Sequence, residues 1–163
     1  MRLLAVIAIV LGGLAATANA AQEPSGTFEV KEVRGSVQIT GERVILGHIE
    51  KGSLRIIDLT PVDQWSPWVN GVPRGKVVWL KGKNISFRIS AGKYKIIANG
   101  EGISISARGT GTTILNGDPD AVGEMGSFRV GDSPFISMPK EATKVAFGKD
   151  ELTTSSYRSV KMP

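Results

Sequence analysis

The sequence has no cysteine, only one histidine, and no long apolar run beyond its first residues. A chain without cysteine forms no disulfide, and the thiol chemistry of cysteine enzymes is excluded. His48 alone leaves little for a catalytic triad or for a metal site built from nitrogen and sulfur ligands. We therefore expect no cofactor and no classical nucleophilic centre.

The first twenty residues have the three zones of a signal peptide: Met1-Arg2, the apolar run Leu3–Leu14, and a small-residue end that closes at Ala20. The apolar run is shorter than the roughly 20 residues that span a bilayer. We expect cleavage after Ala20 with no transmembrane anchor left, and no lipid anchor because Ala21 follows the cut. Together with the missing disulfides, this predicts a bacterial protein exported to the periplasm or the exterior.

The remaining chain has the length of one domain, and we assign residues 21–147 to it. From Gly148 to Pro163 the composition turns polar without periodicity, which predicts a disordered tail. Helical spacing of apolar residues is missing throughout, whereas glycine and β-branched residues are frequent. These features indicate an all-β domain.

Between residues 82 and 115, apolar and polar residues alternate with the period of half-buried strands. Asn99-Gly100 is a strong hairpin signal, so we expect an antiparallel meander here. Its inward residues are predicted to share one buried face, and they are Ile85, Phe87, Ile89, Tyr94, Ile96, Ile103 and Ile105.

Short strands are also predicted elsewhere in the chain, separated by glycine turns and by loops at Pro61–Gly75 and Asn116–Gly126. Their spacing favours an antiparallel β-sandwich of jelly-roll or Greek-key type. The glycines at 82, 92 and 102 also suggest a solenoid repeat, but the ten-residue spacing is not sustained, so we favour the meander. The further strands are expected at Thr27–Val33, Val37–Thr40, Arg43–Ile49, Leu54–Leu59, Val77–Leu80, Thr112–Leu115, Ser127–Val130 and Lys144–Phe147.

Two segments, GHIEKGSLRIIDL from Gly47 to Leu59 and GISISARGTG from Gly102 to Gly111, carry a resemblance. With them the chain resembles small exported bacterial β-proteins that have no assigned activity. The resemblance rests on glycine and alternation patterns over most of the mature chain. It implies the β-rich fold and export, and it implies no catalytic residue.

Two groups of side chains suggest chemistry. On a strand, His48 and Glu50 share a face and form a possible acid–base pair, although an ordinary solvent-facing histidine explains them as well. Alternate oxygen ligands in the loop after residue 115 suggest calcium, but Ala121 and Ser127 stand where the EF-hand loop needs glycine and glutamate. The calcium candidates are Asn116, Asp118, Asp120 and Glu124.

Charge placement is the most unusual feature. From Gln64 to Gly100 the sequence has no Asp or Glu but seven Lys or Arg, and all three tryptophans fall in this window. Cations without neighbouring acids add their potentials, and exposed tryptophan is frequent at binding surfaces. Solvated lysines and core tryptophans are the plainer interpretation. The candidate binding residues are Trp65, Trp68, Arg74, Lys76, Arg88, Lys93 and Lys95.

Three hypotheses about function remain open. The first is an exported, non-catalytic protein that binds an anionic envelope polymer or a glycan, with no specific nucleic-acid partner. The second is an envelope polysaccharide hydrolase that uses a carboxylate pair. The third is a structural or assembly subunit whose free β-edges make the contacts. The carboxylates available to the second are Asp58, Asp63, Glu101, Asp118 and Asp120.

Overall fold

The computed structural model describes residues 26–60 and 64–148, apart from the side chain of Arg43. The expected signal peptide and the expected tail beyond Gly148 lie outside these residues. The described residues form eight strands and no helix, so none of them belongs to a helix that could cross a membrane. The strands are β1 (Gly26–Asp58), β2 (Trp68–Val69), β3 (Val72–Pro73), β4 (Val77–Ile89), β5 (Lys93–Gly117), β6 (Ser127–Val130), β7 (Ile136–Ser137) and β8 (Thr143–Phe147).

The all-β class and the antiparallel pairing are confirmed. All eight strands belong to one sheet, in the order β3-β2-β4-β1-β5-β8, with β6 paired to β1 and β7 paired to β6. The strands therefore do not form the two separately hydrogen-bonded sheets that a β-sandwich has.

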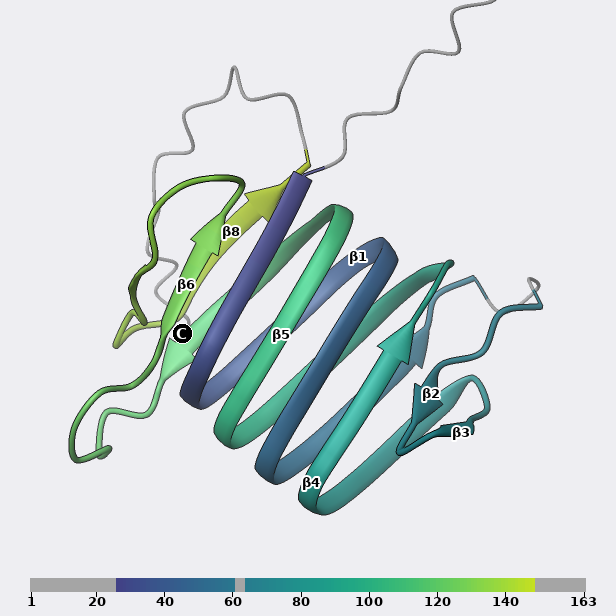
Figure 1. Ribbon diagram of the computed structural model, residues 1–163, viewed down its shortest axis with the longest axis horizontal. Coiled ribbons are helices and arrows are strands. Elements are labelled where there is room, and N and C mark those ends of the chain that lie inside the picture. Colours follow the sequence, from purple (N-terminus) through teal and green to yellow (C-terminus); the bar gives the residue numbers. More distant parts are fainter. Residues whose placement is uncertain (1–25, 61–63, 149–163) are drawn as a thin grey trace, which may run out of the picture.

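The sheet is wound into a coil by its two longest strands, β1 and β5 (Figure 1). Ala98 of β5 pairs with both Val37 and Leu54 of β1, which are seventeen residues apart. Val37 in turn pairs with both Ala98 and Leu115, again seventeen residues apart. Each turn of the double ribbon therefore takes seventeen residues and hydrogen-bonds to the next turn.

The coil has two layers, because β1, β4 and β5 each bend from one layer into the other (Figure 1). We call the layer that holds β2, β6 and residues 83–89 of β4 the front layer. The layer that holds β8 and residues 77–81 of β4 is the back layer. The front layer also holds residues 26–33 and 43–50 of β1 and 103–109 of β5; the back layer holds residues 36–42 and 53–58 of β1 and 93–99 and 111–117 of β5.

Glycines form the lower corner of the coil. Gly52 pairs with both Gly82 and Gly100, and Gly35 pairs with both Gly100 and Gly117. A Cβ atom on Gly100, whose φ is 138°, would lie 2.1 Å from the carbonyl oxygen of Lys51. There is no room for a side chain where neighbouring turns of the coil pass closest to each other. Glycine at these positions lets the hydrogen-bond ladder continue around the bend.

The expected division into short strands is wrong for most of the chain. Four of the predicted strands are parts of the single strand β1, and Asn99-Gly100 lies inside β5 rather than in a hairpin. β4 and β5 do not pair, so the expected meander is also wrong. The glycines that were interpreted as hairpin turns lie at bends within a strand. At each bend the chain passes from one layer to the other, and it does not turn back to pair with itself. The predicted strand Ser127–Val130 coincides with β6.

The core lies between the layers and is almost wholly aliphatic and aromatic. The predicted buried face is confirmed, since the seven residues from Ile85 to Ile105 named above are all at most 4% exposed. Ile85, Phe87 and Ile89 reach it from the front layer, and Tyr94 and Ile96 from the back layer. Alternation identified the inward residues correctly although the strand connections were misassigned, because a bend through a corner preserves which side faces inward.

Candidate functional site on the front layer

Two adjoining hollows mark the outer surface of the front layer. The first, of about 480 Å³, lies where β2 meets β4 and is lined by Trp68, Gly71, Ser86, Phe87, Arg88 and Ser90. Trp68 pairs directly with Arg88 across the two strands, whereas the next residue, Val69, pairs with Phe87 and is buried. Alternation therefore turns the indole and the guanidinium outward together. The indole is 48% exposed.

The second hollow, of about 580 Å³, is centred on Gly47 of β1 and shares Phe87 with the first. A Cβ atom on Gly47 would lie 2.1 Å from the ring of Phe87. Gly47 has the inward parity of its buried neighbours Ile45 and Ile49, so the Phe87 ring, which is 4% exposed, fills on the core side the space that a side chain would take. We call the two hollows together the front trough. It crosses β2, β4, β1, β5 and the first turn of β1, a span of roughly 19 Å at about 4.8 Å per strand.

Polar side chains cross the front trough from strand to strand. The Nδ1 atom of His48 lies 3.2 Å from the hydroxyl of Ser86, and His48 pairs on its other side with Ser104. The hydroxyl of Ser104 accepts a hydrogen bond from the Glu32 amide and donates one to the Glu32 carboxylate. At the opposite end, the side-chain oxygen of Asn70 accepts a hydrogen bond from the Ser86 amide. The row offers both donors and acceptors to a ligand.

Both ends of this polar row have unusual backbone conformations. Glu32 and Asn70 each have a φ of 51°, in the left-handed region that non-glycine residues rarely enter. Glu32 lies where the register between β1 and β5 shifts, at a β-bulge. Asn70 begins the Asn70-Gly71 turn that joins β2 to β3. A positive φ is the usual conformation of Asn70 in a two-residue Asn-Gly hairpin turn, whereas at Glu32 the fold holds a conformation that is unfavourable for glutamate.

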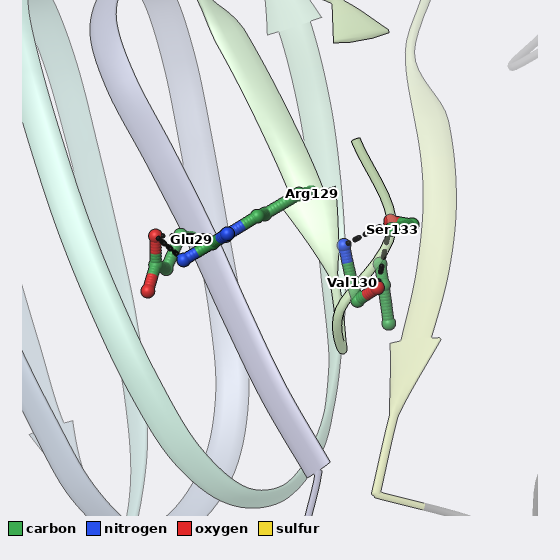
Figure 2. Close-up of polar contacts among 4 residues, drawn as sticks. All are labelled: Glu29, Arg129, Val130 and Ser133. Carbon is green, nitrogen blue, oxygen red and sulfur yellow. Dashed lines mark hydrogen bonds and ion pairs between the residues drawn. The ribbon is translucent and has the colours of Figure 1, made fainter. Parts of the chain in front are cut away.

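An ion pair closes the front trough beside β6. Arg129 lies 2.9 Å from the carboxylate of Glu29, which lines the second hollow, and Figure 2 shows its side chain reaching from β6 to β1. The hydrogen bond to Glu29 raises the pKa of the Arg129 guanidinium. The Ser133 hydroxyl bonds to both the amide and the carbonyl of Val130, which fixes the end of β6 (Figure 2). Glu29 is thereby neutralised, and Arg88 is left as the main charge at the tryptophan end.

The structure brings together only part of the predicted basic window. Trp68 and Arg88 meet on the front layer. Lys93 and Lys95 belong to the back layer, where they pair with Glu42 and Thr40, so they do not share a surface with Arg88. Arg74 and Lys76 are exposed between β3 and β4, and Trp65 lies in the segment before β2.

The calcium candidates do not converge. The Asp118 carboxylate accepts a hydrogen bond from the Asp120 amide, 3.1 Å away, so it stabilises the turn that leaves β5. Asn116 lies within β5, and Glu124 is exposed. Among residues 26–60 and 64–148, no three acidic or histidine side chains form a group that could hold a metal ion.

The carboxylates suggested for a hydrolase do not all meet in one place. Asp58 is buried and accepts a hydrogen bond from the Thr60 amide, and Asp63 lies outside the described residues. Glu101, Asp118 and Asp120 line a groove of about 790 Å³ along the glycine corner. The hydrogen bond from Lys51 lowers the pKa of Glu101. A glycosidase acid needs a raised pKa to hold its proton, so Glu101 is unsuited to that role.

The His48 and Glu50 pair finds no support either. The Glu50 side chain occupies the space above Gly102, where a Cβ atom would meet it. His48 instead approaches Ser86. A serine–histidine contact needs a third group to orient the imidazole, and no hydrogen bond in the described structure supplies a carboxylate to His48.

Sequence reasoning missed most of the front trough, although signals for it exist. Asn70-Gly71 between Val69 and Val72 is a hairpin signal inside the segment assigned to a loop. Gly47 within a strand pattern signals a close approach to the backbone at this point. The repeat of RGSVQI at Arg34–Ile39 and KGSLRI at Lys51–Ile56 has the seventeen-residue period of the coil. Together these would have placed β2 and Gly47 on one layer.

No protein-family model matches this chain, and comparison with curated proteins and with solved structures yields no match to it either.

Proposed function

We propose that this is an exported, non-catalytic protein that binds a glycan in the front trough, with an anionic group of the glycan beside Arg88. The observation that carries the proposal is the cross-strand pair of Trp68 and Arg88 at one end of a row of polar side chains. A flat, exposed indole offers an apolar face to the C–H groups of a sugar ring. The hydroxyl, amide and imidazole groups beyond it suit sugar hydroxyls, which both donate and accept.

The shape of the front trough supports a chain-like ligand. It runs across strands on a rigid sheet, so its contacts are held in place by the ladder rather than by a mobile loop. Sites built on strands are more sharply preorganised than sites on loops, and preorganisation lowers the entropic cost of binding. The expectation of a periplasmic or extracellular location fits such a ligand, since envelope polysaccharides are found there.

The test is binding of the purified protein to soluble polysaccharides, neutral and anionic, and to peptidoglycan, measured by affinity electrophoresis and pull-down. Trp68→Ala should weaken binding roughly thirtyfold, because a tryptophan that acts as a binding hot spot commonly contributes about 2 kcal/mol or more. Arg88→Gln should weaken binding to anionic glycans while leaving neutral ones unaffected.

Trp79→Ala is the matched control. Trp79 is 78% exposed but belongs to the back layer, so its loss removes an equally large apolar side chain away from the front trough. Equal weakening by the two tryptophan variants would contradict the proposal, as would retention of every glycan by Trp68→Ala.

A further inference from the structure

The edges of the two layers are finished differently. In the front layer, β3 covers the outer edge of β2, and β7 covers the outer edge of β6. In the back layer, the outermost segments are residues 77–81 of β4 and residues 143–147 of β8. Within residues 26–60 and 64–148, no strand pairs with the outer edge of either segment. Proteins usually cover or charge such edges, because they template further pairing.

The open edge of β4 carries exposed apolar side chains. Val77 is 63% exposed and Trp79 is 78% exposed, and both turn outward while Val78 turns into the core. The Asp58 amide donates to the Lys76 carbonyl, so the backbone groups of residue 76 face β1. Since backbone groups of successive residues in a strand point to opposite edges, those of Val77 and Trp79 face outward. This edge is equipped to form a ladder.

The strand directions at the two ends fit one another. The back layer consists of six segments, which lie in the order β8, β5, β1, β5, β1, β4. Each segment is antiparallel to its neighbours. With six alternating segments, the first and the last run in opposite directions. If a second copy is placed end to end, its β8 runs antiparallel to β4 of the first, and both segments are five residues long.

Charge also differs between the two ends. Residues 64–89, which hold β2, β3 and β4, have five Lys or Arg and no Asp or Glu. Residues 118–148, which hold β6, β7 and β8, have three Lys or Arg and five Asp or Glu. The basic end of one copy would therefore meet the acidic end of the next, which favours end-to-end contact over contact between like ends.

From these four observations we propose that a second copy of this chain pairs its β8 with residues 77–81 of β4, so that copies stack head to tail through the back layer. Inward and outward residues match when Val78 lies opposite Val145, which also places Trp79 opposite Lys144 and Val77 opposite Ala146. One neighbouring register, with Val78 opposite Phe147, places Lys81 against Lys144 and is opposed by like charge. The paired segments themselves contain no residue that lines the front trough.

Because the protein has no cysteine, the contact is testable by disulfide trapping. Facing residues that exchange hydrogen bonds across an antiparallel pair have Cα atoms about 5.5 Å apart, within the range for a disulfide. Val77→Cys with Ala146→Cys in one chain should give a ladder of covalent oligomers under mild oxidation. Each single variant should stay monomeric, because like positions of two copies do not meet in a head-to-tail contact, and mixing the two should give one mixed dimer.

Two comparisons make the test decisive. Val77→Cys with Thr143→Cys keeps both edges but mismatches the register, and should give at least tenfold less ladder than the matched pair. In the matched background, Trp68→Ala should leave the ladder intact and Trp79→Ala should reduce it several-fold, because the indole lies over Lys144. A matched pair that stays monomeric, or that forms no more ladder than the mismatched pair, would overturn the proposal. Glycan binding by Trp68 is measured separately, so failure of one proposal leaves the other standing.

Discussion

The front and back layers are made from the same three long strands, β1, β4 and β5, yet their outer surfaces differ. The front layer ends in the short strands β3 and β7 and carries a hollowed polar surface with Trp68 at one end. In the part of the chain that the structure describes, no strand pairs with the two outer edges of the back layer, and this layer carries Trp79. Since strands pass from one layer into the other at the glycine corner, the two layers cannot fold independently. The difference shows how one coiled sheet presents two distinct surfaces.

The largest expected effect tests whether the layers share one core. Phe87→Ala in the front layer should lower the free energy of unfolding by about 3–5 kcal/mol, and Ile96→Ala in the back layer by about 2–5 kcal/mol. Both side chains are buried between the layers, so each deletion leaves a cavity. Urea denaturation, monitored by circular dichroism and by tryptophan fluorescence, should show a single transition for each variant.

Arg88→Ala is the control for Phe87→Ala, since Arg88 is the next residue of β4 and is exposed. The free energy of unfolding of the Arg88→Ala variant should differ from that of the parent by less than about 0.5 kcal/mol. If the unfolding midpoints from circular dichroism and from fluorescence differ in the Ile96 variant, the two layers unfold separately. The front and back layers would then be two folding units rather than two surfaces of one.

The next effect concerns the corner that joins the layers. Gly100→Ala should destabilise the protein by roughly 1–3 kcal/mol from its backbone conformation alone, and the contact of the new Cβ atom with the Lys51 carbonyl adds to this. Gly82 belongs to the same row of glycines, but a Cβ atom there meets nothing within 4 Å. Gly82→Ala should therefore be close to neutral in the same thermal unfolding measurement. Equal losses in both variants would show that the close approach at Gly100 does not matter.

These glycines also show where sequence reasoning succeeds and fails. Alternation placed Phe87 and Tyr94 in the core, because side-chain parity is a local property of each strand. It could not distinguish a bend at Gly100 from a hairpin, since both need a glycine with positive φ. What separates them is whether the ladder continues with the next turn, and that depends on residues far away in the sequence.

The prediction of the candidate site was limited in the same way, because it too required knowing which segments lie side by side. Trp68 and Arg88 were both selected from charge and aromatic placement, but their direct pairing follows from the Asn70-Gly71 turn that sets β2 beside β4. Lys93 and Lys95 were selected with them and lie in the other layer, because β5 enters the back layer first. Neighbours in the sequence were thus separated by the coil, whereas His48 and Ser86 were brought together by it.

The smallest expected effect concerns the ion pair that bridges neighbouring turns at the corner. The Lys51 ammonium lies 3.1 Å from the Glu101 carboxylate and lowers the pKa of Glu101, first through its hydrogen bond and then through its charge. A carboxyl group whose pKa is lowered by folding stabilises the folded state above its unfolded pKa of about 4.3, and this contribution is lost as pH falls through the lowered value.

Lys51→Met removes this interaction while keeping the apolar stem. The variant should be slightly less stable than the parent at pH 7, by less than Gly100→Ala, because both side chains of the pair are exposed. The difference between the two proteins should stay constant as pH falls from 7 to about 5 and then shrink below about 4.3, where Glu101 becomes protonated first in the unfolded chain and, at lower pH, in the folded protein too. Added salt should shrink it too, since exposed pairs are screened. Thermal unfolding of both proteins across this pH range measures the effect, and a difference that grows on acidification would mean that Lys51 acts at the corner through packing rather than through Glu101.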